Sequence, residues 1–242
     1  TTVAIGATAI TTLTGTLTAL NTAYAAGTIT GLANEAVTVS DTGVIAAATL
    51  NTIDAATSGV VTVSGVTGLT GVAAQVSLAL AGNGVNNRIA GIPANATATV
   101  TDASVAAETL EAIDLQTTGL VTVTGAAIEG NFTDVKAVLD ANAATPATIA
   151  GLDAINVTLD NSLAGVAGHV ATATYAIANI NTIAGLTTGT ITAGVTETEI
   201  NTLVAANAIA ESGHNLAITY ATTGAAATID AAKLITLNGL TD

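Results

Sequence analysis

The chain has few of the side chains that carry out chemistry in proteins. It contains no Cys, Met or Trp, a single Phe, and three Lys or Arg among 242 residues. Charged residues make up 8% of the chain, against about 25% in ordinary soluble domains. The lack of cysteine excludes a disulfide framework, so stability has to come from packing, assembly or bound metal. The shortage of aromatic side chains argues against a surface that stacks bases or sugars.

The shortage of basic residues excludes a further class of partner. The 17 Asp and Glu residues against three Lys and Arg give a net charge of −14. Nucleic-acid binding requires cations that neutralise phosphates, and the chain supplies only Arg88, Lys136 and Lys233. Anionic membrane surfaces are disfavoured for the same reason. An acidic surface of this kind repels itself at low ionic strength, and salt or divalent cations would relieve that repulsion.

Long hydrophobic runs are also missing. Residues 1–34, 55–87 and 161–196 contain no Asp, Glu, Lys or Arg, but Thr, Gly and Asn interrupt each stretch. A membrane span is predominantly apolar over about 20 residues, so we expect no transmembrane span. Such neutral stretches are buried either within the fold or between subunits, and an apolar surface too large for a monomer marks an association site.

The chain does contain many small aliphatic residues and an internal repeat. Small side chains pack well only where backbones come close, which favours stacked repeating layers. The motif at residues 50–54 (LNTID) returns 60 residues later at 110–114 (LEAID). The motif at 57–65 (TSGVVTVSG) returns at 117–125 (TTGLVTVTG). Shorter echoes of the same text lie at residues 20–22, 180–183 and 187–192. They predict a structural unit of about 30 residues.

Each unit is predicted to read strand, helix, strand. Val-Thr-Val runs alternate with period two, as half-buried strands do. Between them, apolar residues recur at spacings of four and three and share one helix face. These residues are Ala46, Leu50 and Ile53, and in the second copy Ala106, Leu110 and Ile113. We expect Asp41 and Asp102 to cap the helices that follow them.

Glycines and turn residues mark the connections of the unit. Gly59, Gly119 and Gly189 lie between a predicted helix and the next strand, where we expect a left-handed residue. Asn83-Gly84 and Asn238-Gly239 are turn signals. Residues 196–199 (TETE) form a capping-box signature.

A strand followed by a helix and another strand favours parallel pairing. The sequence therefore predicts an α/β repeat solenoid of strand-helix-strand units with a parallel sheet. A β-rich solenoid is the alternative, because Thr is a poor helix former. Residues 1–34 form a charge-free N-terminal segment and candidate assembly element, and residues 35–242 form the repeat domain. Loss of clear register near residues 140–180 could mark a boundary.

Catalytic motifs are not found. Zinc requires three or four N or S ligands, yet neither His169 nor His214 has a His or carboxylate at ligand spacing, and we interpret both as exposed loop residues. There is no Gly-x-Ser-x-Gly elbow, dinucleotide fingerprint or Walker loop. Paired carboxylates could form a glycosidase site, but aromatic platforms are nearly absent. We therefore predict that the chain is not an enzyme.

Calcium is the one cofactor for which candidates exist. Hard cations prefer several oxygen ligands, and acidic residues recur at equivalent positions of the repeat. The candidate ligands are Asp41, Asp54, Asp102, Asp114 and Asp160. The alternative is that Asp41, Asp102 and Asp160 are helix caps and that Asp54 and Asp114 are solvated near helix ends.

The text at residues 39–63, with its copy at 100–123, resembles repeats in large secreted surface proteins of marine bacteria, cyanobacteria especially. Those proteins are similarly acidic, rich in Thr and Ala and poor in sulfur, and include S-layer-like and swimming-associated cell-surface proteins. The resemblance implies a structural role at the cell surface and transfers no catalytic residues. The chain begins with Thr rather than Met, which removal of a signal peptide or cutting from a longer chain would explain.

Together these features predict a secreted, extracellular or cell-surface structural protein. We expect it to self-assemble with copies of itself into a filament or surface lattice. The alternative is a repeat module of a cell-surface adhesin.

Overall fold

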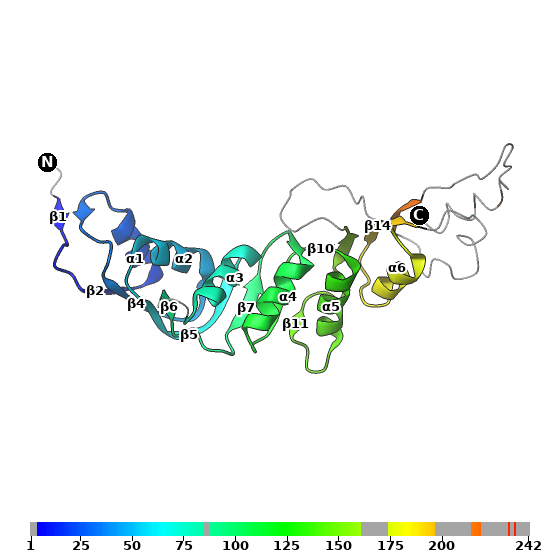
Figure 1. The fold of residues 1–242 in the computed structure, drawn as a ribbon. Helices are drawn as coiled ribbons and strands as arrows, with labels where there is room; N and C mark the ends of the chain where they lie inside the picture. The colour runs from blue at the N-terminus through cyan, green and yellow to red at the C-terminus, as the bar shows by residue number, and fades with distance from the viewer. Residues whose placement is uncertain are drawn as a thin grey trace. The chain divides into compact units, whose positions relative to one another are not determined.

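A computed structural model describes residues 4–84, 88–160, 174–196 and 214–218, together with the single positions 232 and 235 (Figure 1). Within these residues the protein is an α/β structure with parallel sheets and six helices. The chain divides into two compact units, residues 1–102 with 112–124, and residues 103–111 with 125–242. Each unit is described by itself.

The first unit contains a parallel sheet with the strand order β2-β4-β5-β7-β9, and β6 also pairs with β5. A separate small sheet pairs β1 with β3. The strands are β1 (Ile5–Gly6), β2 (Thr12–Gly15), β3 (Ile29–Thr30), β4 (Ala36–Ala46), β5 (Val61–Gly71), β6 (Ile89–Ala90), β7 (Thr97–Val100) and β9 (Val121–Val123). The helices are α1 (Leu17–Ala25), α2 (Ala47–Ala56) and α3 (Ala73–Gly82), and α4 (Ala107–Gln116) has residues in both units.

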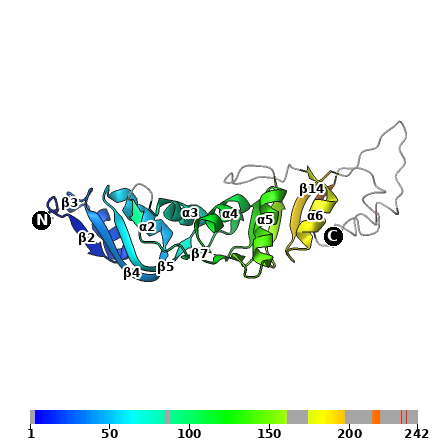
Figure 2. The same cartoon turned by 60° about the horizontal axis from the view of Figure 1, so that its bottom comes forward.

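The helices of the first unit cover one face of its sheet. Helix α1 packs against α2, and α2 packs against α3, while each also contacts the strands beneath it (Figures 1 and 2). Strand alternation explains this two-layer arrangement. In β4, Val37 and Val39 are 0% and 1% exposed, whereas Thr38 and Ser40 point to the other face and are more accessible. The core is therefore a layer of small aliphatic side chains between helices and sheet.

The second unit repeats this architecture. Its sheet has the order β8-β10-β12-β14-β13, with β15 also paired to β14. The strands of this sheet are β8 (Ser104–Ala106), β10 (Ala127–Gly130), β12 (Asn156–Leu159), β13 (Thr174–Tyr175), β14 (Ile191–Val195) and β15 (Asn215–Ile218). The two-residue strand β11 (Ile149–Ala150) is not part of this sheet and contacts α5. Helix α5 (Phe132–Ala143) packs against α6 (Ile177–Ala184) and against β10 and β12.

Strand pairing recurs with the sequence repeat. The same kind of pair joins successive strands in three places: Val37 with Val61, Ala98 with Val121, and Val157 with Ile191. In each, the first residue's amide donates to the carbonyl that precedes its partner, over 2.8, 3.0 and 2.9 Å. The repeat seen in the sequence is therefore also a repeat of backbone hydrogen bonds.

The predicted helices are confirmed, with a shift of one residue at their starts. Helix α2 begins at Ala47 and buries Ala47, Leu50 and Ile53. Ala46 is exposed, since it is still the last residue of β4. In α4 the buried residues are Ala107, Leu110 and Ile113, all 0% exposed, whereas the predicted Ala106 is the half-buried last residue of β8. The spacing of Leu and Ile was thus sufficient to place both helices, but the alanine of each buried face lies one residue later than predicted.

The predicted helix caps are wrong in one respect, because each aspartate caps an earlier helix. Asp41 Oδ2 accepts a 2.7 Å hydrogen bond from the amide of Leu17, the first residue of α1. Asp102 Oδ2 accepts one of 2.6 Å from Ala73, the first residue of α3. Strand β4 continues past Asp41 to Ala46, so this side chain lies beside the start of α1. Within the first unit, each cap therefore ties one sequence repeat to another.

The prediction of left-handed glycines in the Thr-Ser/Thr-Gly motif is also wrong. Positive φ angles occur at other glycines, such as Gly31 (92°) and Gly91 (95°). At Gly59, Gly119 and Gly189 an added Cβ would overlap the carbonyl oxygens of Glu35, Ala96 and Ile155. Glycine is required there for close approach of two backbones.

The turn signal at Asn83-Gly84 does lie at a turn, with φ of 75° at Gly84. The signals at Asn238-Gly239 and residues 197–199 lie outside the described residues.

Candidate functional site

The five aspartates predicted as calcium ligands lie in different parts of the chain. Asp41 and Asp102 use a carboxylate oxygen to cap α1 and α3. Asp54, near the end of α2, forms an ion pair of 3.0 Å with Arg88. Each of these three aspartates thus has a partner within the protein.

The other two candidates are also separated. Asp114 lies on α4, and Asp160 follows β12, where it is 4% exposed and its amide donates to Gly130 over 2.8 Å. Across the described residues, no group of three His, Asp or Glu side chains is close enough to hold a metal ion. The structure thus brings none of these five residues together as a site, and calcium binding stays a prediction.

Of the two histidines, His214 is described by the structure, and it is buried rather than exposed. His214 is 6% exposed, and its Nδ1 accepts a hydrogen bond of 3.3 Å from the amide of Ile191 in β14. Its interpretation as an exposed loop residue is therefore wrong. This burial could not be predicted, because the residues around His214 read as a loop in the sequence. His169 lies outside the described residues.

The most repeated polar feature is a threonine that joins two backbones, which we call the threonine latch. Thr57 donates through Oγ1 to the carbonyl of Glu35 (2.7 Å) and accepts from the amide of Gly59 (3.0 Å). The same two bonds recur elsewhere: Thr117 bonds Ala96 and Gly119 at 2.5 and 3.0 Å, and Thr187 bonds Ile155 and Gly189 at 2.9 and 3.1 Å. These hydroxyls are buried and hydrogen-bonded, so their role is to hold successive sequence repeats together.

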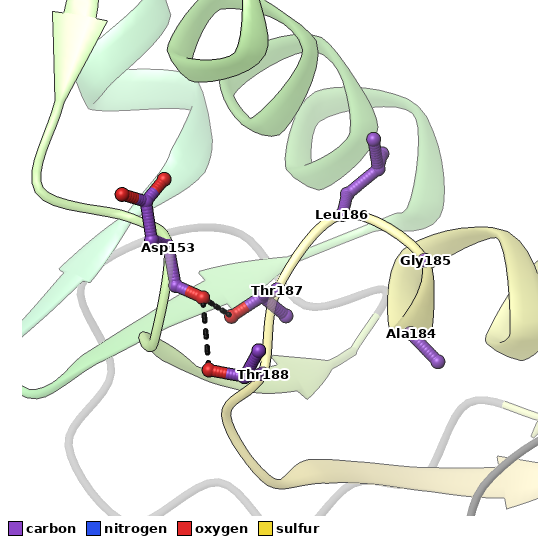
Figure 3. Close-up of a pocket in the computed structure, with 6 residues that line it drawn as sticks. All are labelled: Asp153, Ala184, Gly185, Leu186, Thr187 and Thr188. Atoms are coloured by element: carbon purple, nitrogen blue, oxygen red, sulfur yellow. Dashed lines mark hydrogen bonds between the residues drawn. The ribbon is translucent and has the colours of Figure 1, made fainter.

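A shallow pocket of about 300 Å³ lies at the third latch (Figure 3). It is lined by Asp153, Ala184, Gly185, Leu186, Thr187 and Thr188. The carbonyl of Asp153 accepts hydrogen bonds from the hydroxyls of Thr187 and Thr188 at 3.4 and 3.1 Å, while its carboxylate points away from them. That carboxylate accepts a 2.6 Å bond from Asn142. The polar groups are thus engaged with one another, and the lining residues include no nucleophile paired with a base.

A buried carboxylate was missed by the sequence reasoning. Glu35 is 1% exposed, and it accepts hydrogen bonds from the hydroxyl of Tyr24 and from the amides of Ala33 (2.9 Å) and Asn34 (3.2 Å). Burial by itself would raise the pKa of Glu35, but these hydrogen bonds outweigh it and hold the pKa below its ordinary value. Burial raises the pKa of Tyr24, and the neighbouring Glu35 carboxylate raises it further. The one sequence signal for Glu35 is that it is the first charged residue of the chain.

The N-terminal part of the first unit presents apolar side chains and open strand edges to solvent. Ile5 is 59% and Ile10 is 41% exposed, and Leu13 is half-buried. Within the described residues β2 pairs with β4 alone and β1 pairs with β3 alone. We call β1, β2 and these three side chains the N-terminal edge. An unpaired edge with exposed aliphatic residues is a template for another chain, so this edge is the candidate functional site.

Comparison with known proteins found no matching family model, curated protein or solved structure. No helix in the described ranges is both long and apolar enough to cross a membrane.

Proposed function

We propose that this protein is an extracellular structural subunit that assembles with copies of itself into a filament or surface lattice. The observation that carries the proposal is the N-terminal edge. Free strand edges are usually blocked by charge, proline or a covering loop. Strand β2 instead reads Thr-Leu-Thr-Gly and lies in a 34-residue stretch with no charged side chain.

The charge distribution supports the same function. The molecule carries −14 overall, so random encounters between molecules are repulsive. Residues 1–34 contribute none of that charge. Contacts through the N-terminal edge therefore avoid the repulsion that the rest of the surface provides, and this favours one mode of association over others.

We further propose that the sequence repeats stack as a solenoid. The recurring parallel pairs, the three threonine latches and the caps at Asp41 and Asp102 are all contacts between successive repeats. A repeat of this kind cannot bury its faces alone and depends on its neighbours. A stack that ends in an open edge can continue into a second molecule. The resemblance to secreted surface repeats and the acidic composition support an extracellular location.

The test is assembly of the purified chain at near-marine salt, measured by negative-stain electron microscopy and sedimentation velocity. The wild type is expected to form regular filaments or sheets. The double variant Thr12→Lys/Thr14→Lys places charge on β2 and is expected to reduce polymer at least tenfold. Thr62→Lys/Ser64→Lys is the matched control, because it adds equal charge at exposed positions of the interior strand β5. Isolated particles from the wild type at high concentration would refute the proposal.

A further inference from the structure

The N-terminal edge has an internal counterpart elsewhere in the same unit. Residues 13–15 and 69–71 both read Leu-Thr-Gly, at the ends of β2 and β5. Helix α1 follows the first motif at Leu17, and helix α3 follows the second at Ala73. The two segments are therefore equivalent at an offset of 56 residues. By this offset, β1 and β2 correspond to the two halves of β5.

Equivalent side chains differ sharply in burial. Positions that are buried in β5 are more accessible to solvent at the N-terminal edge. Ile5 is 59% exposed against 0% for Val61, Ile10 is 41% exposed against 5% for Val66, and half-buried Leu13 corresponds to Leu69 at 0%. The cover that β5 receives is thus missing from β1 and β2.

That cover is β4 in the interior of the unit. Val37 of β4 lies opposite Val61, Gly43 opposite Val66, and Ile45 opposite Leu69. The N-terminal edge therefore lacks a neighbouring strand equivalent to β4, the strand that pairs with both halves of β5.

Strand β15 is a candidate for this missing strand, because its pairing matches that of the interior strand β12. Strand β15 pairs with β14 from Thr192 with Asn215 to Val195 with Ile218. Strand β12 pairs with β10 in the same way, from Ala127 with Asn156 to Gly130 with Leu159.

Strand β12, however, has a second neighbour that β15 lacks among the described residues. On its other side, β12 pairs through Val157 with Ile191 of β14, as β4 pairs through Val37 with Val61 of β5. The residue of β15 equivalent to Val157 is Leu216. Within the described residues β15 has β14 as its one partner.

We propose that β15 of one molecule pairs in parallel with β1 of the next, placing Leu216 opposite Ile5. By the recurring pattern of the interior pairs, the amide of Leu216 donates to the carbonyl of Ala4 of the second molecule. This inference rests on the proposed self-assembly and specifies its contact. The contact is head-to-tail, so it does not close on itself as a twofold dimer does. It predicts a filament as the elementary assembly.

The closing experiment uses the absence of cysteine from the chain. Adjacent strands lie about 4.8 Å apart, within the Cα separation that a disulfide spans. A mixture of Ile5→Cys protein and mass-tagged Leu216→Cys protein is expected to form a disulfide-linked heterodimer on mild oxidation. Leu78→Cys replaces Leu216→Cys in the control mixture, because Leu78 is 56% exposed on α3 and lies outside the proposed contact. That mixture is expected to yield at least tenfold less heterodimer.

A second pair of variants measures the contact without oxidation. Ile5→Lys is expected to abolish polymer in sedimentation velocity, whereas Val44→Lys, at a side chain 53% exposed, is expected to leave it unchanged. Circular dichroism checks that both variants fold. Polymer without the Ile5–Leu216 cross-link, or polymer that tolerates Ile5→Lys, would overturn this contact while leaving self-assembly standing. If the wild type does not polymerise and the mixture of cysteine variants does not cross-link, both the contact and self-assembly would be overturned.

Discussion

At the scale of the residue, the protein uses its few polar groups to join backbone segments. The threonine latch is the clearest case, since one buried hydroxyl satisfies both the carbonyl of the residue just before a strand and a glycine amide. Threonine was visible in the sequence as part of a repeated motif, but its role was not. The motif could be predicted to form a helix-to-strand connection because it recurs with the apolar spacing. Its glycine was assigned to φ rather than to close approach, because the opposing carbonyl comes from a segment more than 20 residues away.

The latch leads to a prediction at Thr117. Replacement Thr117→Val keeps the shape but leaves the buried carbonyl of Ala96 and the amide of Gly119 without this partner. Unsatisfied buried groups cost about 1–3 kcal/mol, so the free energy of unfolding measured in urea is expected to fall by that amount. The control is Thr118→Val, whose hydroxyl is exposed and whose loss should cost under about 0.5 kcal/mol. Equal effects of both variants would contradict the latch.

The buried pair of Tyr24 and Glu35 gives a prediction that depends on pH. Tyr24→Phe removes a hydrogen bond to a buried carboxylate, and at pH 7 we expect it to lower stability by about 1.5–3 kcal/mol. The folded-state pKa of Glu35 is lowered, so its contribution is present above the ordinary value near 4.3 and is lost as pH falls through the folded pKa. The difference between wild type and variant should therefore shrink in urea titrations from pH 7 to pH 3. A difference that stays constant would show that the hydrogen bond does not favour the charged carboxylate.

At the scale of the element, the positions of helices could be predicted from the sequence, but the helix that each aspartate caps could not. Helices α2 and α4 could be predicted because Leu50 and Ile53, and their equivalents Leu110 and Ile113, define a face by local spacing. Capping by Asp41 depends on which strand lies beside which helix, and that is set by non-local pairing of β4 with β2. The same distinction applies to β1 and β2. The sequence shows that residues 1–34 carry no charge, but the exposure of their apolar side chains is seen only in the structure, by comparison with the equivalent positions of β5.

The cap that Asp41 provides for α1 can be tested by substitution. Asp41→Ala removes the acceptor for the first amide of α1, and loss of such a cap costs about 0.5–2 kcal/mol. Amide hydrogen exchange should show the added opening in α1 rather than in α2, the helix that follows Asp41 in sequence. Asp140→Ala is the comparison variant, because Asp140 is exposed and forms a surface pair with Lys136, a type of pair worth about 0–1 kcal/mol. Faster exchange in α2 alone would contradict the assignment of the cap.

At the scale of the whole molecule, a charge of −14 acts against any contact between two copies. The Debye length falls from about 30 Å at 0.01 M salt to about 3 Å at 1 M, so the repulsion between approaching molecules is removed by salt. Polymer measured by light scattering is therefore expected to rise steeply with sodium chloride over this range. The N-terminal edge is neutral and apolar, so screening weakens the repulsion without weakening the contact.

Calcium provides the sharper form of this prediction. Asp41 and Asp102 already accept bonds from helix amides, and Asp54 is paired with Arg88. We therefore expect calcium chloride at matched ionic strength to give about as much polymer as sodium chloride, with magnesium chloride as the divalent control. An excess of polymer specific to calcium would contradict screening as the sole effect. Asn substitutions at Asp54, Asp114 and Asp160 would then identify the ligands, because removal of a true ligand would abolish the calcium excess while leaving the response to sodium chloride intact.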